Sequence, residues 1–439
     1  MNGNSKSPFE GFSKLSLPER QERLSQLFAL SQEEIEVLMG IRHSLTVEQA
    51  EHLIENVVGL FTLPLGLATH FRIDGRDLAI PMAVEETSVV AAASASAKWV
   101  HRNGGFKTRS LGNLIIGQVQ FPTVKNPVSF SELVKASSGN LIDQANEAVP
   151  NLIARGGGVK DLQVRLIDRP DGQTMAVLHL LCDPCDAMGA NLINQVCESL
   201  KGPLEELTGE RVGLCILSNL VDTKLVEATC EIHDITPELG NAIAEATLFA
   251  NLDPYRGTTH NKGVMNGIDP ILIATGNDWR AVEAGMHAYM TMGGQYRSIT
   301  EWKYEDGVLK GKLVAPIAVG TVGGVTRIHP TARVCLKIMG VKHAEELARI
   351  CAAAGLAQNL SALRALCSEG IVAGHMRLHA ANLALAAGAE KDELPIVEEQ
   401  LRQESRITLS RAKELLEQIR QMRLADPVQT RSAAVVTSD

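Results

Sequence analysis

One lysine, Lys262, lies in a polar stretch that runs from Asp253 to Arg280. It is the only lysine between Lys224 and Lys303. An ammonium group among amides and carboxylates can stabilise negative charge that develops on an oxygen during a reaction. The ordinary alternative is a solvated loop lysine, so the neighbouring residues must decide between the two interpretations.

The same stretch carries further polar side chains beside a short apolar run, Ile271–Thr275. Arg256 and Asn266 precede that run, and Asp278 follows it. We expect the run to be a strand. We also expect Asp278 to cap the next helix, because Asp is a preferred residue at helix N-termini. This density of polar groups around one apolar element favours a functional site over a solvated lysine.

Two histidines, His375 and His379, have the i, i+4 spacing of helical metal ligands. The residues between them are Met-Arg-Leu, so the glutamate of an H-E-x-x-H zinc motif is missing. One of them could instead be an acid and the other a core or capping group. Cys182 and Cys185 have redox or metal-ligand spacing, but no second pair accompanies them at zinc-binding distance. Two nearby buried cysteines are favoured, and no metal is expected.

The run Asp186-Ala-Met-Gly-Ala-Asn191 places a carboxylate, a glycine and an amide at a predicted helix N-terminus. Backbone N–H groups at such an end attract anions, and Gly189 would let a ligand approach the backbone closely. Asp186 could equally be only a helix cap. The chain has neither a G-x-G-x-x-G motif nor a Walker lysine, so the sequence supports neither a Rossmann fold nor a P-loop.

At 439 residues the chain is long enough for two or three domains. Its net charge of −9 and 4% aromatic content argue against a nucleic-acid surface. The N-terminus lacks the pattern of a signal peptide, and the most apolar segment, Val57–Ala68, is too short to span a membrane. Eight cysteines without a secretory signal indicate reduced thiols. We therefore expect a cytoplasmic protein without nucleic-acid or membrane partners.

Capping patterns and periodicity assign the outer elements coarsely. Capping boxes at Ser16, Ser31 and Thr46 predict a helical start. Residues 72–82 alternate as a strand pair, and the alanine-rich run Val89–Val100 predicts a closely packed helix. Later helices are expected at Pro237–Ala250, Trp279–Met290, Thr331–Ile338, Ala344–Ala357 and Asn359–Ser368. One or two amphipathic helices are expected over Pro395–Arg423, with an apolar stripe at Leu409, Ala412, Leu416, Ile419 and Met422.

The middle of the chain changes to short β-rich segments. Strands are expected at Leu114–Val119, Leu162–Ile167, Thr174–Cys182 and ending near Leu217, with helices around Phe130–Ala148 and from Asn191 through Leu200. The order strand, helix, strand, strand, helix, strand predicts a ferredoxin-like inserted domain.

Six motifs, taken together and in this order, closely resemble the 3-hydroxy-3-methylglutaryl-coenzyme A (HMG-CoA) reductase family, in its soluble bacterial class (class II). They are Glu55-Asn-Val-Val-Gly59, Pro81-Met-Ala-Val-Glu-Glu86, Asp186–Asn191, Asp253–Arg280, Gly320-Thr-Val-Gly-Gly324 and Gly374-His-Met. The resemblance covers residues 14–424. It implies an α+β fold with a large helix-rich substrate domain (1–112 and 219–374), an inserted non-Rossmann cofactor domain (113–218), and a helical C-terminal flap with a disordered tail (375–439).

The resemblance also implies an activity: four-electron reduction of HMG-CoA to mevalonate and CoA by two reduced nicotinamides, through a hemithioacetal and mevaldehyde, in either direction. It places the catalytic set on Glu86, Lys262, Asp278 and His375. Lys262 would stabilise the oxyanion, and Asp278 would hold that lysine charged. Glu86 would supply a proton, and His375 would protonate the departing CoA thiolate.

Ligand contacts follow from the same resemblance. The substrate would be bound by Glu55, Ser88, Arg256 and Asn359, with Asn219, Asn266 and Gln358 as further candidates, and the cofactor by Asp186, Met188, Gly189, Ala190 and Asn191. An acid that NADH-specific relatives carry falls on Val149 here, so an obstacle to a 2′-phosphate is absent and NADPH is slightly favoured over NADH. Sites shared between subunits imply a homodimer or a higher oligomer. The alternatives are a non-redox acyl-CoA hydrolase or lyase, and a silent CoA-binding protein.

Overall fold

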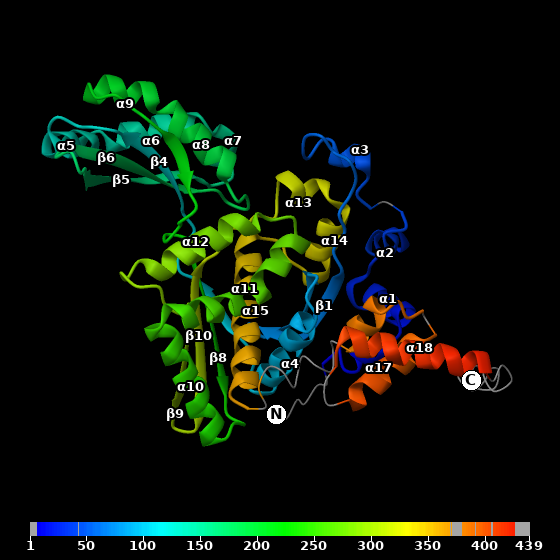
Figure 1. The fold of residues 1–439 in the computed structure, drawn as a ribbon. Coiled ribbons are helices and arrows are strands. Elements are labelled where there is room, and N and C mark those ends of the chain that lie inside the picture. The colour runs from blue at the N-terminus through cyan, green and yellow to red at the C-terminus, as the bar shows by residue number, and fades with distance from the viewer. Residues whose placement is uncertain are drawn as a thin grey trace. The chain divides into compact units, whose positions relative to one another are not determined.

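The computed structural model describes residues 7–42, 44–368, 370, 380–390, 392–404 and 407–425 (Figure 1). The chain divides into two compact units, of which the second takes in Glu86–Ser88 and the described residues after Ser361. The first unit contains helices and three β-sheets, and the second is helical in its described part. The α+β fold expected from the sequence is confirmed. His375, His379 and the tail after Ala425 lie outside the described residues.

The first described helices start at capping boxes. Helices α1, α2 and α3 cover Leu17–Phe28, Gln32–Met39 and Val47–Ala50. Each box has two contacts, at Ser16, Ser31 and Thr46. The hydroxyl of the cap residue accepts from the backbone N–H three residues later, and the side chain of that later residue accepts from the backbone N–H of the cap residue, as the sequence predicts. Ile35 packs against Ile338 in a common apolar cluster, which anchors these helices on the rest of the first unit.

A β-hairpin follows, made of β1 (Leu65–Ile73) and β2 (Arg76–Ala83) in antiparallel register. Its turn, Asp74-Gly75, has φ angles of 50° and 83°, a left-handed pair that Asp-Gly accommodates. The predicted strand pair is confirmed, although it begins earlier than the alternation indicates. Helix α4 (Val89–Arg102) packs on β1, with side chains such as Ala97 fully buried, because small residues allow a short separation.

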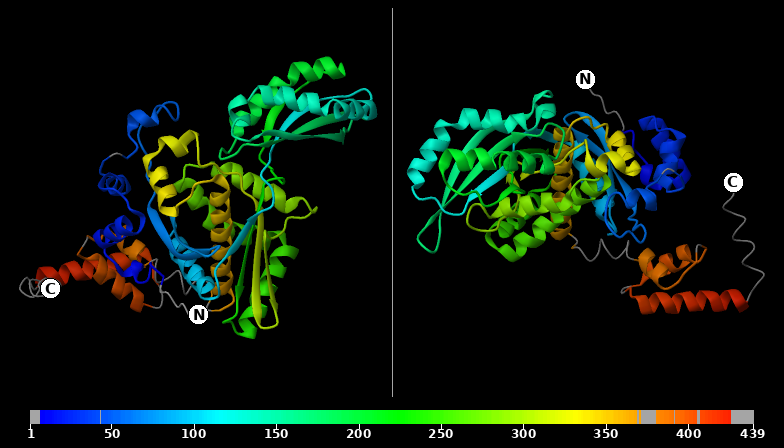
Figure 2. Two further views of the ribbon diagram at one scale, coloured as in Figure 1. Left: turned by 180° about the vertical axis from the view of Figure 1, so that it is seen from behind. Right: turned by 90° about the horizontal axis from the view of Figure 1, so that it is seen from above.

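The middle of the chain forms a four-stranded antiparallel sheet in the order β5-β6-β4-β7. The strands are β4 (Ile115–Phe121), β5 (Gly158–Asp168), β6 (Thr174–Asp183) and β7 (Cys215–Ser218). The helices are α5 (Pro127–Ala136), α6 (Ser138–Glu147), α7 (Pro150–Ile153), α8 (Ala190–Ser199) and α9 (Lys201–Thr208). The helices lie along one face of this sheet (Figures 1 and 2). This order matches the predicted ferredoxin-like arrangement.

One expectation for this domain is wrong: the single helix around Phe130–Ala148 is two helices. The chain breaks at Ser137, which has φ −95° and ψ 3°. The sequence Ser-Ser-Gly at this point supplies poor helix formers, and serine side chains compete for backbone hydrogen bonds. The break lets α5 and α6 take separate directions over the sheet.

The inserted domain joins the large domain through two segments that are hydrogen-bonded to each other. Leu111 N donates to Leu225 O at 2.8 Å, Leu114 N donates to Thr223 O at 3.3 Å, and the Thr223 hydroxyl donates to Leu114 O at 2.7 Å. Gly112 lies so close to Thr223 O that a Cβ there would overlap it. The outgoing and returning chain therefore form one narrow antiparallel ribbon.

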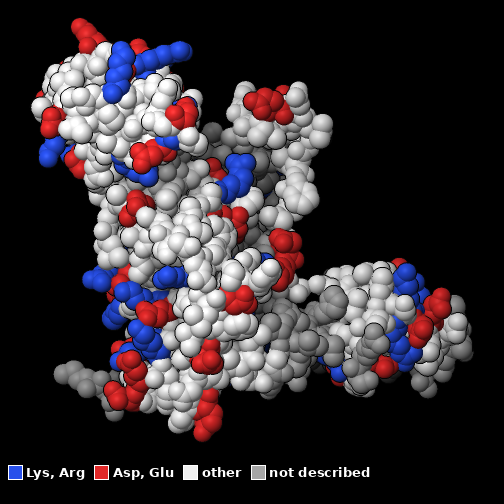
Figure 3. Space-filling model, turned by 60° about the vertical axis from the view of Figure 1, so that its left-hand side comes forward, with Lys and Arg blue, Asp and Glu red and all other residues white. Residues whose placement is uncertain are grey.

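The large domain has its own antiparallel sheet, in the order β3-β8-β10-β9. These strands are β3 (Lys107–Ser110), β8 (Leu225–Ile232), β10 (Val308–Pro316) and β9 (Thr300–Glu305). The helices are α10 (Pro237–Leu252), α11 (Pro254–Ala274), α12 (Trp279–Thr291), α13 (Gly324–Ile328), α14 (Pro330–Met339) and α15 (Ala344–Leu366). Ion pairs such as Lys312–Glu227 at 2.8 Å link neighbouring strands. Figure 3 shows basic and acidic side chains interspersed on one face of the molecule, which gives that face no broad patch of a single sign.

Helix α15 is continuous, where the sequence pattern predicts one helix ending at Ala357 and another starting at Asn359. The polar residues at the expected break are buried within it. The helix also approaches α11 closely at two glycines. A Cβ on Gly267 would lie 2.6 Å from Ala354 O, and one on Gly355 would lie 2.9 Å from Ile268 Cδ1. This tight packing fixes α11 in place.

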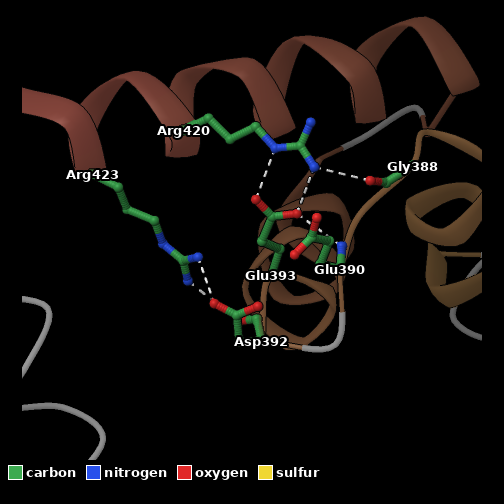
Figure 4. Close-up of polar contacts among 6 residues, drawn as sticks. All are labelled: Gly388, Glu390, Asp392, Glu393, Arg420 and Arg423. Atoms are coloured by element: carbon green, nitrogen blue, oxygen red, sulfur yellow. Dashed lines mark hydrogen bonds and ion pairs between the residues drawn. The ribbon is translucent and has the colours of Figure 1, made fainter.

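In the second unit, α17 (Leu394–Gln403) and α18 (Leu409–Ala425) pack through Val397, Leu401 and Leu416. The predicted apolar stripe on α18 is wrong at its two ends, because the side chains of Leu409 and Met422 are 39% and 69% exposed. Arg420 binds Glu393 through two contacts of 2.8 Å and donates to Gly388 O, while Arg423 pairs with Asp392 (Figure 4). These pairs hold α18 to the segment that leads into α17.

Candidate functional site

Lys262 lies in helix α11 and not in a loop, and the apolar run Ile271–Thr275 forms the last turn and the C-cap of that helix and not a strand. The helix begins where Asp253 accepts hydrogen bonds from two backbone N–H groups of the first turn and Pro254 occupies the first helical position. The strand prediction is wrong because a five-residue apolar run cannot by itself distinguish a strand from the end of a buried helix.

The two sides of α11 differ in burial. Residues such as Asn261 and Ile268 face the interior and are fully buried. Lys262 is exposed, and Asn266 and Asp269, which follow it at helical spacing, are half-buried. Because the opposite side packs against α15, the Lys262 ammonium is presented on the open side of a firmly held helix.

Asp278 caps α12, as the sequence predicts. One carboxylate oxygen accepts a hydrogen bond from Ala281 N at 3.1 Å and lies 3.5 Å from Arg280 Nε. The side chain is 39% exposed, so this cap also presents negative charge toward solvent. Lys262 and Asp278 thus come from two consecutive helices joined by a short turn.

The turn before Asp278 is held by hydrogen bonds that sequence reasoning missed. Asn277 Oδ1 accepts from Gly320 N at 2.8 Å, and Asn277 Nδ2 donates to Thr275 Oγ1 at 3.0 Å. Gly276 has φ 67° and packs against Thr326 N. The signal was present in the sequence, since Asn277 and Gly320 lie in two of the recognised motifs, but nothing in the sequence shows that these motifs meet.

The same loop at Gly320 also contacts the predicted cofactor segment. A Cβ on Gly320 would lie 2.6 Å from Met188 N, and Thr321 N donates to Asp186 O at 2.9 Å. The turn that carries Asp278 and the segment Asp186–Asn191 are therefore connected through residues 320 and 321. This connection fixes the distance between the two candidate sites.

Asp186 caps helix α15, which is distant in sequence, and not the helix α8 that follows it. Its carboxylate accepts from Ala344 N at 2.9 Å and lies 3.2 Å from His343 Nδ1, at the start of α15. Helix α8 itself begins after Gly189, which has φ 94° and makes no side-chain cap. Gly189 is required by this φ and by its contact with Ile115, where a Cβ would lie 2.5 Å from the Ile115 Cδ1. The first N–H groups of α8 remain suited to an anion.

A small cavity brings several predicted residues together. Met188, Ala190, Asn219 and Ala281 line it, so the inserted domain, the segment after β7 and α12 all contribute. Two of the expected cofactor residues, Met188 and Ala190, and one expected substrate residue, Asn219, thus meet beside the helix that Asp278 caps.

Two expected substrate ligands lie in the core. Asn359 is 1% exposed; its Oδ1 accepts from Trp302 Nε1 at 2.8 Å and from Thr300 Oγ1, and its Nδ2 lies 3.0 Å from His260 Nε2. Burial lowers the pKa of His260 to about 3, with the Arg256 charge adding to the effect, so this imidazole is neutral. Gln358 is 6% exposed. The geometry favours an indirect role for Asn359.

The remaining predicted residues have varied settings. Arg256 is half-buried in the first turns of α11, whereas Glu55 is exposed. Val149 is 6% exposed and lies in the apolar core of the inserted domain.

Glu86 and Ser88 belong to the second unit, and Ser88 adopts φ 77°, a left-handed conformation uncommon for a residue other than glycine. Within the described ranges no group of three or more His, Cys, Asp or Glu side chains could hold a metal ion. Cys182 is fully buried and Cys185 half-buried, both as free thiols. Among the helices that the structure describes, none combines the length and apolar character needed to cross a bilayer.

Comparison with known proteins supplies the family. The model of the hydroxymethylglutaryl-coenzyme A reductase family matches residues 17–380. A 3-hydroxy-3-methylglutaryl-coenzyme A reductase of Archaeoglobus fulgidus is 46% identical over 418 residues, covering 94% of this chain and 95% of that protein. A probable reductase of Borreliella burgdorferi is 33% identical, covering 75% of this chain and 76% of its own length.

Solved structures agree with the sequence relatives. A reductase from Streptococcus pneumoniae superposes with a TM-score of 0.80 at 40% identity, covering 94% of this chain and 99% of that one. A class II enzyme of the same organism, bound to NADPH in open conformations, gives 0.79 at 40% identity, covering 82% and 100%. The chain is thus an oxidoreductase that uses a nicotinamide cofactor. It belongs to the hydroxymethylglutaryl-coenzyme A reductase family, as its motifs indicate.

Proposed function

We propose that this chain reduces HMG-CoA to mevalonate and CoA at the open side of α11, with NADPH or NADH as reductant. The observation that carries this proposal is the connection between the Asp278 turn and the segment Asp186–Asn191 through Gly320 and Thr321. A hydride transfer needs the substrate carbonyl and the cofactor held at a fixed separation. This connection supplies such a frame.

The proposed chemistry begins with Lys262. Reduction of a thioester carbonyl develops negative charge on oxygen, and an ammonium on the open side of a rigid helix can stabilise that charge. Asp278, the cap of the next helix, is assigned as the carboxylate partner of that ammonium. Glu86 supplies a proton to the developing alkoxide, and His375 protonates the departing CoA thiolate.

For substrate binding, we assign the carboxylate end of HMG-CoA to Arg256, because paired guanidinium donors match a carboxylate. Asn219 and Asn266 are direct polar contacts in this assignment. Glu55 and Ser88 complete the set, while Asn359 and Gln358 act by holding the core beneath α11.

The cofactor pyrophosphate is assigned to the N-terminus of α8. Its first N–H groups lack a side-chain cap, and a helix N-terminus attracts phosphate. Met188, Ala190 and Asn191 would lie alongside the dinucleotide, which supplies the hydride when bound. Asp186 fixes the segment by capping α15, and Gly189 shapes its turn. With Val149 in the core, the slight preference for NADPH rests only on the absence of an acid at this turn.

We further assign the chain to a cytoplasmic homodimer, or a higher oligomer, with active sites shared between copies. The support is an apolar segment without regular structure in which Val58 is 103% and Phe61 is 91% exposed, with Ile54 at 63%. Exposed apolar groups of this extent mark an interaction surface. Light scattering at several concentrations tests the assignment, and a monomer at all of them would contradict it.

The central test is an assay with purified protein, HMG-CoA and each reduced nicotinamide. Conversion of a thioester to an alcohol takes four electrons and each hydride carries two, so two nicotinamides should be oxidised for each CoA released. Release of CoA without nicotinamide oxidation would instead show a hydrolase or lyase. Binding of CoA without release or oxidation would show a silent CoA-binding protein.

A further inference from the structure

A cavity of about 290 Å³, which we call the junction cavity, lies where the inserted domain joins the large domain. Ser110 and Lys224, from the two segments that connect the domains, line it together with Asp183 and Asp186 of the inserted domain and the start of α15. Lys262 is not in its walls. Sites for drug-sized ligands usually enclose about 300–1,000 Å³, so the junction cavity suits a smaller molecule.

Lys224 is a buried lysine whose side chain lines this cavity. It is only 7% exposed. Within the described ranges its ammonium group makes neither a hydrogen bond nor an ion pair. Burial lowers the pKa of this group, and the charges nearby offset that effect only in part. A buried charge that lacks a partner is costly, so the ammonium is suited to receive an anion from the cavity.

Ser110 supplies a second donor to the same cavity. Its Oγ is buried and has no hydrogen-bond partner among the residues that the structure describes. Ser110 pairs with Val226 in the ladder between β3 and β8, and Lys224 lies two residues before Val226. Side chains two residues apart in an extended chain point to the same side, so the hydroxyl and the ammonium group enter the cavity from one side.

The two aspartates in the walls are already hydrogen-bonded. Asp183 accepts from Asn113 Nδ2 at 2.6 Å and from Cys185 N at 2.9 Å, and both oxygens of Asp186 are engaged at the start of α15. Buried donors and acceptors are as a rule paired in folded proteins. The unused groups at this place are the donors of Lys224 and Ser110, and they call for an acceptor.

We propose that the junction cavity binds a small monocarboxylate, held by Lys224 and Ser110. A carboxylate only accepts hydrogen bonds and offers two oxygens, one for each donor. Its single charge balances the ammonium group through a charge-assisted hydrogen bond. An anion of higher charge fits less well, because Asp183, Asp186 and Glu345 line the same cavity. Bound there, the carboxylate ties together the two segments that connect the domains.

The test uses the full chain with acetate as the probe, at an ionic strength held constant with sodium chloride. Broadening of the acetate methyl resonance in NMR should reveal saturable binding at millimolar acetate. Lys224→Met should weaken that binding about 10-fold or more, since a hydrogen bond to a charged group is among the stronger ones. Ser110→Ala should weaken it about 2- to 10-fold.

Hydrogen exchange places the bound acetate. Leu111 N donates to Leu225 O and Leu114 N donates to Thr223 O between the connecting segments. Acetate should slow the exchange of these two amide groups in the wild type and not in Lys224→Met. Acetate binding that leaves their exchange unchanged would lie elsewhere and would reject the proposal.

The matched control is Lys310→Met. Lys310 is an exposed lysine of β10 that lies 3.5 Å from Glu305, and its replacement should leave the acetate affinity unchanged. No saturable binding by the wild type, or equal affinity in Lys224→Met and Ser110→Ala, would overturn the proposal. So would binding that persists in Lys224→Met and disappears in Arg256→Ala, because acetate would then occupy the proposed substrate site. Should Lys224→Met fail to fold, Ser110→Ala decides alone.

Discussion

Gly320→Ala tests whether the loop at residue 320 sets the position of the cofactor segment. The new Cβ would lie 2.6 Å from Met188 N, where ordinary contact begins at 3.4 Å, so the backbone must yield by about 0.8 Å. Both sides of this contact are backbone, and neither can move away as a flexible side chain would. Overpacking of this kind costs about 1–3 kcal/mol.

The strain can appear in two measurable places. If the segment Asp186–Asn191 moves in the free protein and is restored by the cofactor, NADPH affinity falls by about 5- to 150-fold, since 1.4 kcal/mol is a factor of ten. If it does not move, the strain lowers the unfolding temperature instead. Titration calorimetry with NADPH and thermal unfolding of the same samples separate these cases.

Gly202→Ala is the matched control within the inserted domain. Gly202 lies in α9, and a Cβ there meets no atom within 4 Å, so the change should be neutral or stabilise by about 0.5–1 kcal/mol. An unaltered NADPH affinity in Gly320→Ala, with a lowered unfolding temperature, would refute the link between this loop and the cofactor. An unaltered affinity and temperature would refute the contact itself.

Further outcomes follow from the same structure. Lys262→Ala should lose about 10²–10³-fold in kcat with HMG-CoA and with mevaldehyde alike, because both reductions build charge on oxygen; retention of either activity would contradict its role. His375→Ala should still reduce mevaldehyde while failing on the thioester, and equal losses would reject its action on CoA. The Arg420 guanidinium holds the pKa of Glu393 at about 2, whereas the pKa of a glutamate in an unfolded chain is about 4.3. The stability that the ionised Glu393 adds to α17 and α18 is therefore present above about pH 4.3 and is lost as the pH falls toward 2. Glu393→Gln should abolish that acid dependence in hydrogen-exchange protection factors. Burial raises the pKa of Cys182 and Cys335 to about 12, so iodoacetamide should modify them in the unfolded chain and not in the native one, as mass spectrometry would report.

Local features were predictable wherever neighbouring residues determine them. The capping boxes at Ser16 and Ser31, the cap at Asp278 and the hairpin turn at Asp74-Gly75 depend on contacts within three or four residues. The order of elements in the inserted domain was also accessible, because strand and helix periodicities differ. Element ends and breaks, such as the one at Ser137, depended on weaker preferences.

Long-range pairings were not predictable. The sequence placed Asp186 at a helix start, but the helix it caps begins 158 residues later, at Ala344. The run Ile271–Thr275 reads as a strand in isolation, and only packing against α15 makes it part of a helix. The burial of Val149 likewise depends on which elements fold over it. The motifs identified the family, yet they did not show how the motifs contact one another.

The ribbon at residues 111–114 and 223–225 has a consequence for how this chain is organised. Because Leu114 and Thr223 are already in contact, the intervening residues enter and leave the large domain at a single point. Because the two ends of the inserted domain are held together, folding of the large domain closes only a short loop at this point, and the entropic cost of loop closure is small. A two-residue hairpin could replace everything between Leu114 and Thr223 without separating β3 from β8. Removal of these residues would also take away Asp186, which caps α15 and accepts a hydrogen bond from Thr321 N, so the start of α15 and the 320–321 loop would lose these contacts.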